Sequence, residues 1–262
     1  MDSSNPVVEQ IEGPVATVQL NREKQHNAFT PEMVSALSDS FIRLGLDKSV
    51  RVVILTGRGR SFCAGADLTS MRNAATQTDT ENLADAEAIF DLMLTIDCCP
   101  LPVVGRINGT AVGGGVGLVS CCDFAVAVNR AHFGLSEVRL GLVPAVISPF
   151  VISKIGPSNA RELFLSGGRI DAKRAREIGL VHYVVEEDKL DQVVEERVQE
   201  LLRSAPGAVS AAKKLIRTVG GKSVEELRTY TTRLIAERRK SPEGREGMDA
   251  FLEKRDPWWR EQ

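Results

Sequence analysis

The 262-residue sequence lacks several features that would place it in a familiar class at once. Nowhere do 18 uninterrupted apolar residues occur, which argues against a membrane-spanning helix. The formal net charge of −2 offers no general attraction to nucleic acid or to an anionic membrane surface. The first six residues contain no basic region followed by an apolar core, so no secretory signal is predicted and we expect a cytoplasmic protein.

Disulfide and metal-site patterns are also missing. The five cysteines are odd in number, occur partly as adjacent pairs and contain no Cys-x-x-Cys spacing, so neither a disulfide framework nor a zinc site is predicted. We expect most of them to be small buried hydrophobic residues in a reducing compartment. They are Cys63, Cys98, Cys99, Cys121 and Cys122.

The usual nucleotide-binding motifs are absent too. No Gly-x-Gly-x-x-Gly run follows an expected strand, so there is no dinucleotide fingerprint. The tripeptide at 221–223 resembles the end of a phosphate-binding P-loop, but Ile216 stands where that motif requires glycine. We assign this tripeptide to the start of a helix.

Apolar periodicity predicts an α/β fold. Residues 7–20 alternate apolar and polar positions around Gly13-Pro14, which predicts a β-hairpin. Thr30-Pro31 is an N-cap followed by proline, and it opens an amphipathic helix. A short apolar strand suited to burial on both faces follows at 51–57.

The same order then repeats. After a polar loop over 73–82, which we expect to be mobile, a helix over 83–94 precedes a strand at 102–107. A short helix through Cys122 and a strand at 123–128 follow, so crossover helices should cover a mostly parallel sheet. Beyond residue 188 only helical periodicity remains, and we place a domain boundary between residues 1–200 and 201–262.

Two glycine-containing turns stand out chemically. In the first, at 107–118, the run Gly113-Gly114-Gly115 joins a strand to a helix and leaves backbone N–H groups uncovered. Such donors, reinforced by the partial positive charge of a helix N-terminus, can stabilise a developing oxyanion. The second turn, at 61–68, also follows a strand, so the two turns together could offer two donors to one oxygen.

With this pair of turns the sequence resembles the enoyl-CoA hydratase/isomerase (crotonase) superfamily. The resemblance covers nearly the whole chain. It is carried by Leu20-Asn21-Arg22, Asn27-Ala28, Phe62-Cys63-Ala64-Gly65-Ala66-Asp67-Leu68, Ile107-Asn108-Gly109 with the glycine run, Cys122-Asp123, Ala131-His132-Phe133-Gly134, Gly141-Leu142-Val143-Pro144, Ala172 to Leu180 and Phe251-Leu252-Glu253-Lys254-Arg255.

The resemblance implies a spiral of repeated β-β-α units and a helical C-terminal oligomerisation region, assembled as a homotrimer or homohexamer. It also implies an acyl-CoA thioester substrate whose oxygen is held by the N–H groups of Ala66 and Gly114. Lys24 and Lys254 would contact the CoA phosphates, Lys254 from a neighbouring subunit. No metal or redox cofactor, nucleic acid or membrane partner is implied. The turn expected to lie against CoA comprises Cys63, Ala64, Gly65, Ala66, Asp67 and Leu68.

The acid/base residues distinguish this chain from many hydratases of the superfamily. Those enzymes carry one glutamate three residues after the middle glycine, where this sequence has Gly117, and a second about twenty residues later, matched by Glu137. Glu137 is therefore the expected catalytic acid and base. His132 or Ser136 could assist it.

Two further aspartates and one arginine near these motifs have an expected structural role. Asp67 and Asp123 should fix loops through hydrogen bonds to the backbone. Arg139, two residues beyond Glu137, could bind an acidic substrate tail, but we favour pairing with a protein carboxylate.

The segment 136–150 resembles a bacterial branch assigned to methylglutaconyl-CoA hydration in leucine and isoprenoid breakdown. The leading hypothesis is therefore hydration of a branched, carboxylated enoyl-CoA. A Δ3,Δ2-enoyl-CoA isomerase remains open, because one glutamate suffices for it. A non-catalytic acyl-CoA-binding or RNA-binding protein is the third alternative, although the acidic pI counts against RNA.

Overall fold

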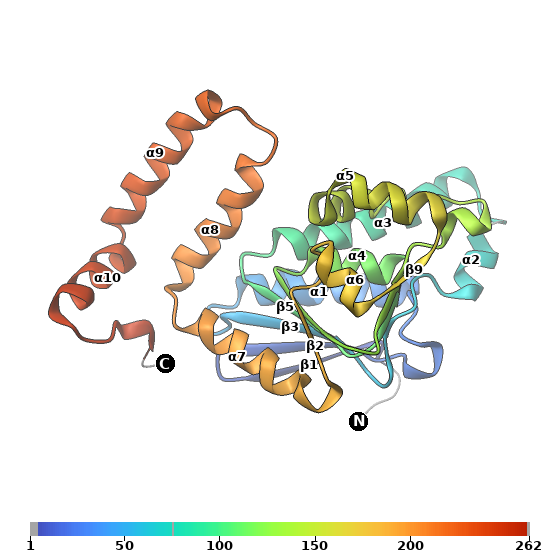
Figure 1. Ribbon diagram of the computed structural model, residues 1–262, viewed down its shortest axis with the longest axis horizontal. Coiled ribbons are helices and arrows are strands. Elements are labelled where there is room, and N and C mark those ends of the chain that lie inside the picture. Colours follow the sequence, from blue (N-terminus) through green and yellow to red (C-terminus); the bar gives the residue numbers. More distant parts are fainter. Residues whose placement is uncertain (1–4, 75, 261–262) are drawn as a thin grey trace.

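The computed structural model describes residues 5–74 and 76–260, which form two β-sheets covered by helices (Figure 1). In the larger sheet the strand order is β1-β2-β3-β5-β7-β10. The predicted hairpin is confirmed by the antiparallel pair β1 and β2, and every other neighbouring pair is parallel. The strands are β1 (Val7–Glu12), β2 (Val15–Leu20), β3 (Val52–Gly57), β5 (Val103–Ile107), β7 (Phe124–Val128) and β10 (Tyr183–Val185).

A second, four-stranded sheet has the order β4-β6-β8-β9, in which only the last pair is antiparallel. The sequence patterns did not predict it, because strands of three residues are too short for an alternation to register. Each round of the chain adds one long strand, one short strand and helices, so the repeated β-β-α spiral is confirmed. The short strands are β4 (Ser61–Cys63), β6 (Thr110–Val112), β8 (His132–Gly134) and β9 (Arg169–Asp171).

Helices cover both faces of the larger sheet. The first, α1 (Pro31–Leu46), begins where its N-cap predicts, with the Thr30 hydroxyl accepting the Met33 N–H at 3.4 Å. Figure 1 shows α7 on the opposite side of the sheet from α1, α3 and α4. The remaining core helices are α2 (Leu68–Ala74), α3 (Asp79–Cys98), α4 (Gly114–Cys121), α5 (Ser148–Ser166), α6 (Ala172–Glu177) and α7 (Leu190–Leu202), with short 3-10 helices η1 (Glu23–Gln25), η2 (Glu137–Leu140), η3 (Glu187–Lys189) and η4 (Trp258–Arg260).

The prediction of a polar loop over residues 73–82 is wrong for most of that span, which is helical. Helix α2 continues to Ala74 and α3 already begins at Asp79. Thr78 and Glu81 form a capping box, in which each side chain accepts the other's backbone N–H. This Thr-x-x-Glu signature starts a helix despite its polar composition. Residue 75 lies outside the described residues.

The C-terminal helices form an arm, which we define as α8 (Pro206–Val219), α9 (Val224–Lys240) and α10 (Pro242–Glu253), and α8 is its part nearest the core (Figure 1). The structure describes every residue of α8 and α9, and none is buried. Ser223 caps α9, which confirms the predicted helix start. Helix α7 instead buries Leu190, Val194 and Val198 in the core and ends near the boundary predicted at residue 200.

Arg51 joins the arm to the core. Its guanidinium donates to the carbonyl oxygens of Leu202 and Ser204, just before the arm, and of Trp259, just after it. Of the five cysteines, four are buried and Cys98 is exposed, as expected for most of them. Among the described residues, no helix combines the length and the apolar character needed to cross a membrane.

Candidate functional site

The two glycine-containing turns meet in space. Gly65 has a φ of +84°, a left-handed conformation that favours glycine. A Cβ atom at Gly65 would lie 2.8 Å from the Val112 carbonyl oxygen and 3.5 Å from the Gly114 nitrogen. The turn after β4 therefore lies directly against the turn that opens α4, as the motif pair predicts.

Phe29 leaves one N–H of the first turn free. Its own N–H donates to the Gly65 carbonyl at 2.7 Å, and its carbonyl accepts the Asp67 N–H at 3.0 Å. Within the described residues, no protein acceptor takes the N–H of Ala66, which lies between these two bonded positions. Gly114 is the first residue of α4, so its N–H has no acceptor within that helix. Two free donors thus come from adjoining turns.

Asp67 holds the first turn in place. Its carboxylate accepts the Thr69 N–H at 2.8 Å and the Arg22 guanidinium at 3.0 Å. Burial alone would raise the pKa of Asp67, but these hydrogen bonds and the charge of Arg22 outweigh burial and lower it. The predicted loop-fixing role of Asp67 is confirmed. Asp123 acts similarly, accepting the Val103 N–H at 2.7 Å.

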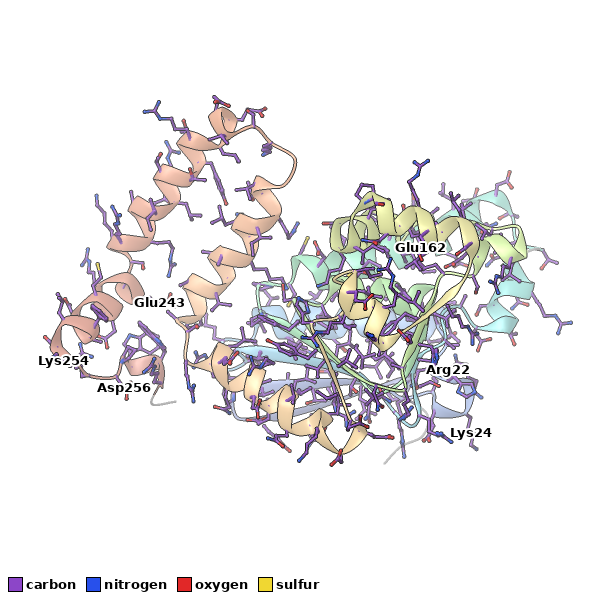
Figure 2. All side chains as sticks on the ribbon, viewed as in Figure 1. Arg22, Lys24, Glu162, Glu243, Lys254 and Asp256 are labelled. Carbon is purple, nitrogen blue, oxygen red and sulfur yellow. The ribbon has the colours of Figure 1, made fainter. Side chains whose placement is uncertain are left out.

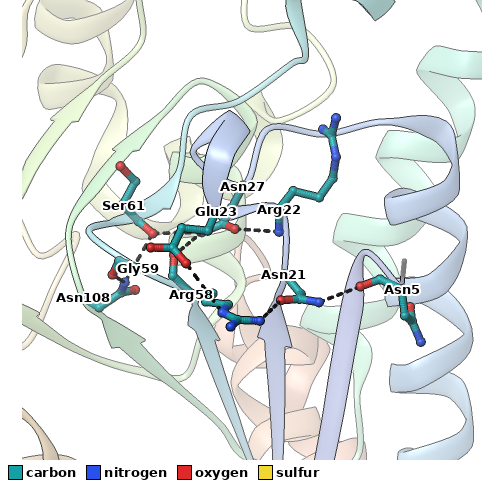
Figure 3. Close-up of polar contacts among 9 residues, drawn as sticks. All are labelled: Asn5, Asn21, Arg22, Glu23, Asn27, Arg58, Gly59, Ser61 and Asn108. Carbon is teal, nitrogen blue, oxygen red and sulfur yellow. Dashed lines mark hydrogen bonds and ion pairs between the residues drawn. The ribbon is translucent and has the colours of Figure 1, made fainter. Parts of the chain in front are cut away.

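Two buried asparagines brace the loop between β3 and β4 (Figure 3). Asn27 is fully buried, and its side-chain amide donates to the carbonyl oxygens of Arg58, Ser61 and Phe62. Asn108 accepts the Gly57 N–H and donates to the carbonyl of Gly59. Because the hydrogen-bonding groups of these buried amides have partners, the amides make the loop rigid. This loop leads into the turn at 63–68.

Glu137 lies beside the glycine run. It begins η2, and a Cβ atom at Gly113 would come within 3.1 Å of its Oε1. Its other carboxylate oxygen, Oε2, is buried and has no hydrogen-bond partner among the described residues. Burial raises the pKa of this carboxyl, and the backbone hydrogen bond at its own residue offsets only part of the increase. A half-buried carboxyl with a raised pKa and a free oxygen is suited to moving a proton.

Apolar side chains fill the space beside Gly117, the position at which the resemblance implies the other acid. A Cβ atom at Gly117 would lie 2.7 Å from Ile147 Cγ2 and 3.1 Å from the Met93 methyl carbon. Both side chains belong to the buried core. A glutamate therefore has no space at Gly117, and Glu137 faces the glycine run without a carboxylate at that position.

Within the described residues, neither of the two residues that could assist Glu137 forms a side-chain hydrogen bond with it. His132 is exposed, with its Nδ1 lying 3.1 Å from the Arg130 carbonyl oxygen. Ser136 precedes η2 but does not cap it with its side chain. The predicted pairing of Arg139 with a protein carboxylate is wrong, because its guanidinium faces the Ser166 carbonyl oxygen at 3.5 Å.

The residues expected to face CoA differ in exposure. Ala64 and Ala66 are exposed, while Gly65 and Asp67 are buried. Leu68 begins α2, and its side chain lies outside the described part of the structure. Burial raises the pKa of the Cys63 thiol to about 12, so this side chain stays neutral. A contact between Cys63 and a ligand would have to use its main chain.

Lys24 and Lys254 are not brought together within one chain. Lys24 lies in η1 beside the core, whereas Lys254 ends α10 at the tip of the arm (Figure 2). Figure 2 places them at opposite ends of the molecule. A single ligand can contact both residues only if they come from different copies of the chain.

Sequence reasoning missed the residues that shape the site from a distance. Phe29 directs the Ala66 N–H, and Met93 and Ile147 close the space beside Gly117. No local signal identifies them, because each is an ordinary apolar residue within a helix or loop. Arg22 belonged to a recognised motif, but its contact with Asp67 was not expected.

Comparison with known proteins agrees with this geometry. A family model described as enoyl-CoA hydratase/isomerase matches residues 10–262. The chain is 33% identical to a carnitinyl-CoA dehydratase of Salmonella typhimurium over 257 residues, which cover 95% of each protein. A solved enoyl-CoA hydratase of Shewanella pealeana shares 37% identity with a TM-score of 0.94 over 97% of this chain and 96% of that one. Pseudomonas aeruginosa AtuE shares 35% identity with a TM-score of 0.93 over 97% and 99% of the two chains.

Proposed function

The chain belongs to the enoyl-CoA hydratase/isomerase family, and we propose that it is a hydratase of α,β-unsaturated acyl-CoA thioesters that works with one carboxyl group. The observation that carries this proposal is the position of Glu137. Its carboxyl group lies beside the glycine run, with Oε1 nearest Gly113, and its other oxygen, Oε2, is buried without a partner among the described residues. Gly114, also in this run, offers an unused N–H. A proton-transferring group thus adjoins an oxyanion donor.

The proposed reaction begins with the thioester oxygen between the N–H groups of Ala66 and Gly114. The Glu137 carboxylate removes a proton from water while the water oxygen bonds to the β-carbon. The electrons of the carbon–carbon double bond move onto the thioester oxygen, and the two donors stabilise this enolate. Protonated Glu137 then gives its proton to the α-carbon, which restores both the thioester and the carboxylate. These steps move only water and protons, so they call for neither a metal nor a redox cofactor.

We propose a branched, carboxylated acyl group such as that of methylglutaconyl-CoA. Support comes from the resemblance of the 136–150 segment to that branch. The same segment follows Glu137 with Leu140, Leu142 and Val143, all of which are more than half exposed. These side chains offer apolar surface for a branched chain near the reacting carbons.

A Δ3,Δ2-enoyl-CoA isomerase is the second candidate, because the closed space beside Gly117 leaves one carboxyl group and an isomerase needs only one. The deciding experiment incubates the protein with straight, branched and carboxylated enoyl-CoAs and follows product mass. A gain of one water supports hydration, whereas a moved double bond at constant mass supports isomerisation. No turnover of any ester would contradict both and favour an acyl-CoA-binding or RNA-binding protein.

We further propose a homotrimer or homohexamer in which the arm of one copy reaches the site of another. The arm carries exposed apolar residues, including Phe251 and Leu252, that one copy leaves uncovered. Lys254 follows directly after Glu253, the last residue of α10, and can meet a CoA bound near Lys24 only in a neighbouring copy. Light scattering on the purified protein tests the assembly.

A further inference from the structure

A cavity lies between the C-terminal end of α4, the start of α5 and the inner face of α8. We call it the α4–α8 cavity. Its volume is about 700 Å³, within the range of small-molecule sites. Most of its wall is apolar and includes Phe124, Pro149, Phe150, Val209 and Ile216.

This cavity is separate from the proposed catalytic site. Gly114 lies at one end of α4, and Cys121 and Cys122, which line the cavity, lie at or just past the other end, about 10 Å away by the rise of an α-helix. The Met93 and Ile147 side chains fill the space in between, and Met93 Sδ lies 3.8 Å from Cys121 Sγ.

The side chains that line the cavity carry one more positive charge than negative charges. Lys213 pairs with Asp123 at 2.6 Å, and Arg217 pairs with Asp97 at 3.2 Å. Lys154 makes none of the ion pairs found in the described part of the chain. Its ammonium donates one hydrogen bond to the Cys122 carbonyl oxygen at 2.6 Å, and an ammonium has three donors.

Lys154 is thus a cation without a carboxylate partner on an apolar wall. Burial lowers the pKa of Lys154, a sign that the protein does not fully compensate its charge. One unbalanced positive charge matches a ligand with one negative charge rather than a polyanion. The apolar wall matches a hydrocarbon body.

We propose that the α4–α8 cavity binds an amphipathic monocarboxylate, such as a free medium-chain fatty acid, with its carboxylate on Lys154 and its chain against the apolar wall. This site is independent of the proposed thioester reaction. It requires neither CoA nor Glu137.

Calorimetric titration of the full-length protein with sodium octanoate tests the proposal. We expect saturable binding at one site per chain, and weaker binding of octanol, which has no charge. Lys154→Met should weaken octanoate binding roughly tenfold or more, the scale of a lost hydrogen bond to a charged group. Lys154→Arg should stay within about threefold, because a guanidinium also binds carboxylates.

Two further variants separate binding from folding. Ala212→Trp should fill the cavity from α8 and remove binding while Lys154 remains. Lys214→Met, an exposed change on the same helix outside this cavity, should bind like the unchanged protein. The proposal is overturned if the unchanged protein does not bind octanoate. That result is expected if a second copy of the chain fills the cavity, or if Lys154 serves only to donate a hydrogen bond to the Cys122 carbonyl oxygen. Equal binding by Lys154→Met would overturn it as well.

Discussion

Arg22 and Asp67 form an ion pair of 3.0 Å that connects the end of β2 to the turn carrying the Ala66 donor. Both side chains are largely shielded from water, at 21% and 12% exposure, so solvent screens this pair less than an exposed one. Arg22 also donates to the Ala28 carbonyl, next to Phe29. The pair therefore holds together the two segments that leave the Ala66 N–H free.

Arg22→Met should lower kcat roughly 10- to 100-fold, because a small displacement of a donor weakens its contact with the enolate. KM should change less, since Arg22 itself touches no acyl group in this scheme. Steady-state kinetics with the best enoyl-CoA substrate measures both. The matched control is Arg43→Met, which breaks an exposed ion pair with Glu9 and should leave kcat unchanged.

Glu137→Gln should lower kcat about 10²- to 10⁴-fold, because it removes the proton-transferring group and keeps its size. Binding of the substrate should persist, as measured by calorimetry with a saturated acyl-CoA. Glu162→Gln, a change in an exposed ion pair on α5, serves as the control. Full turnover by Glu137→Gln would remove Glu137 from the mechanism.

The raised pKa of Glu137 also predicts how stability depends on pH. Because burial raises the pKa in the folded state above the ordinary 4.5, the folded protein holds this proton more tightly than the unfolded chain. The stability contributed by protonated Glu137 is fully present below pH 4.5 and is lost as the pH rises through the folded-state pKa of this group. Glu137→Gln does not titrate, so its Tm should exceed that of the unchanged protein at neutral pH, and this advantage should disappear below 4.5.

Glu81→Gln provides the opposite case. Hydrogen bonds from the Thr78 backbone and hydroxyl lower the pKa of Glu81 in the folded state. The stability that the ionised Glu81 contributes is therefore present above pH 4.5, the ordinary pKa, and is lost as the pH falls through the folded-state pKa. Thermal unfolding across pH should therefore show differences of opposite sign for the two variants. The same sign for both would contradict the assignment of burial as the cause at Glu137.

Gly117→Glu should not create a second catalytic acid. The new side chain would overlap Ile147 and Met93, and overpacking of this kind costs about 1–3 kcal/mol before the buried charge is counted. We expect a lower free energy of unfolding in urea and no gain in hydration rate. Gly220→Ala, where a Cβ atom would have no neighbour closer than 3.8 Å, is the control. Faster hydration by Gly117→Glu would show that the space can open.

If the arm of one copy brings Lys254 to the CoA bound at a neighbouring copy, mixing two defective variants should restore activity. Lys254→Met should raise KM for CoA esters, and Glu137→Gln should lower kcat. In a mixed oligomer, a subunit with intact Glu137 can receive intact Lys254 from its neighbour. Co-refolded mixtures should therefore exceed the summed activity of the separate variants at low substrate concentration, and strictly additive activity would place Lys254 away from the neighbouring site.

The sequence alone determined the local elements of this protein. Thr30-Pro31 starts a helix, the alternation over 7–20 forms a hairpin, and the glycine run opens α4, because caps, periodicity and glycine conformation act within a few residues. The resemblance of the motifs also identified the family, and it predicts Glu137 as the catalytic acid and base. The three-residue strands escaped detection because pairing, not pattern, defines them.

Only the tertiary structure decided what surrounds those motifs. Phe29 meets the turn at Ala66, Met93 and Ile147 occupy the space beside Gly117, and Lys254 lies far from Lys24. Each of these relationships joins segments that are distant in the chain, so it depends on how helices and sheets pack rather than on any local preference. The motif that identifies the family therefore could not reveal that the space beside Gly117, at its first acidic position, is filled by apolar side chains.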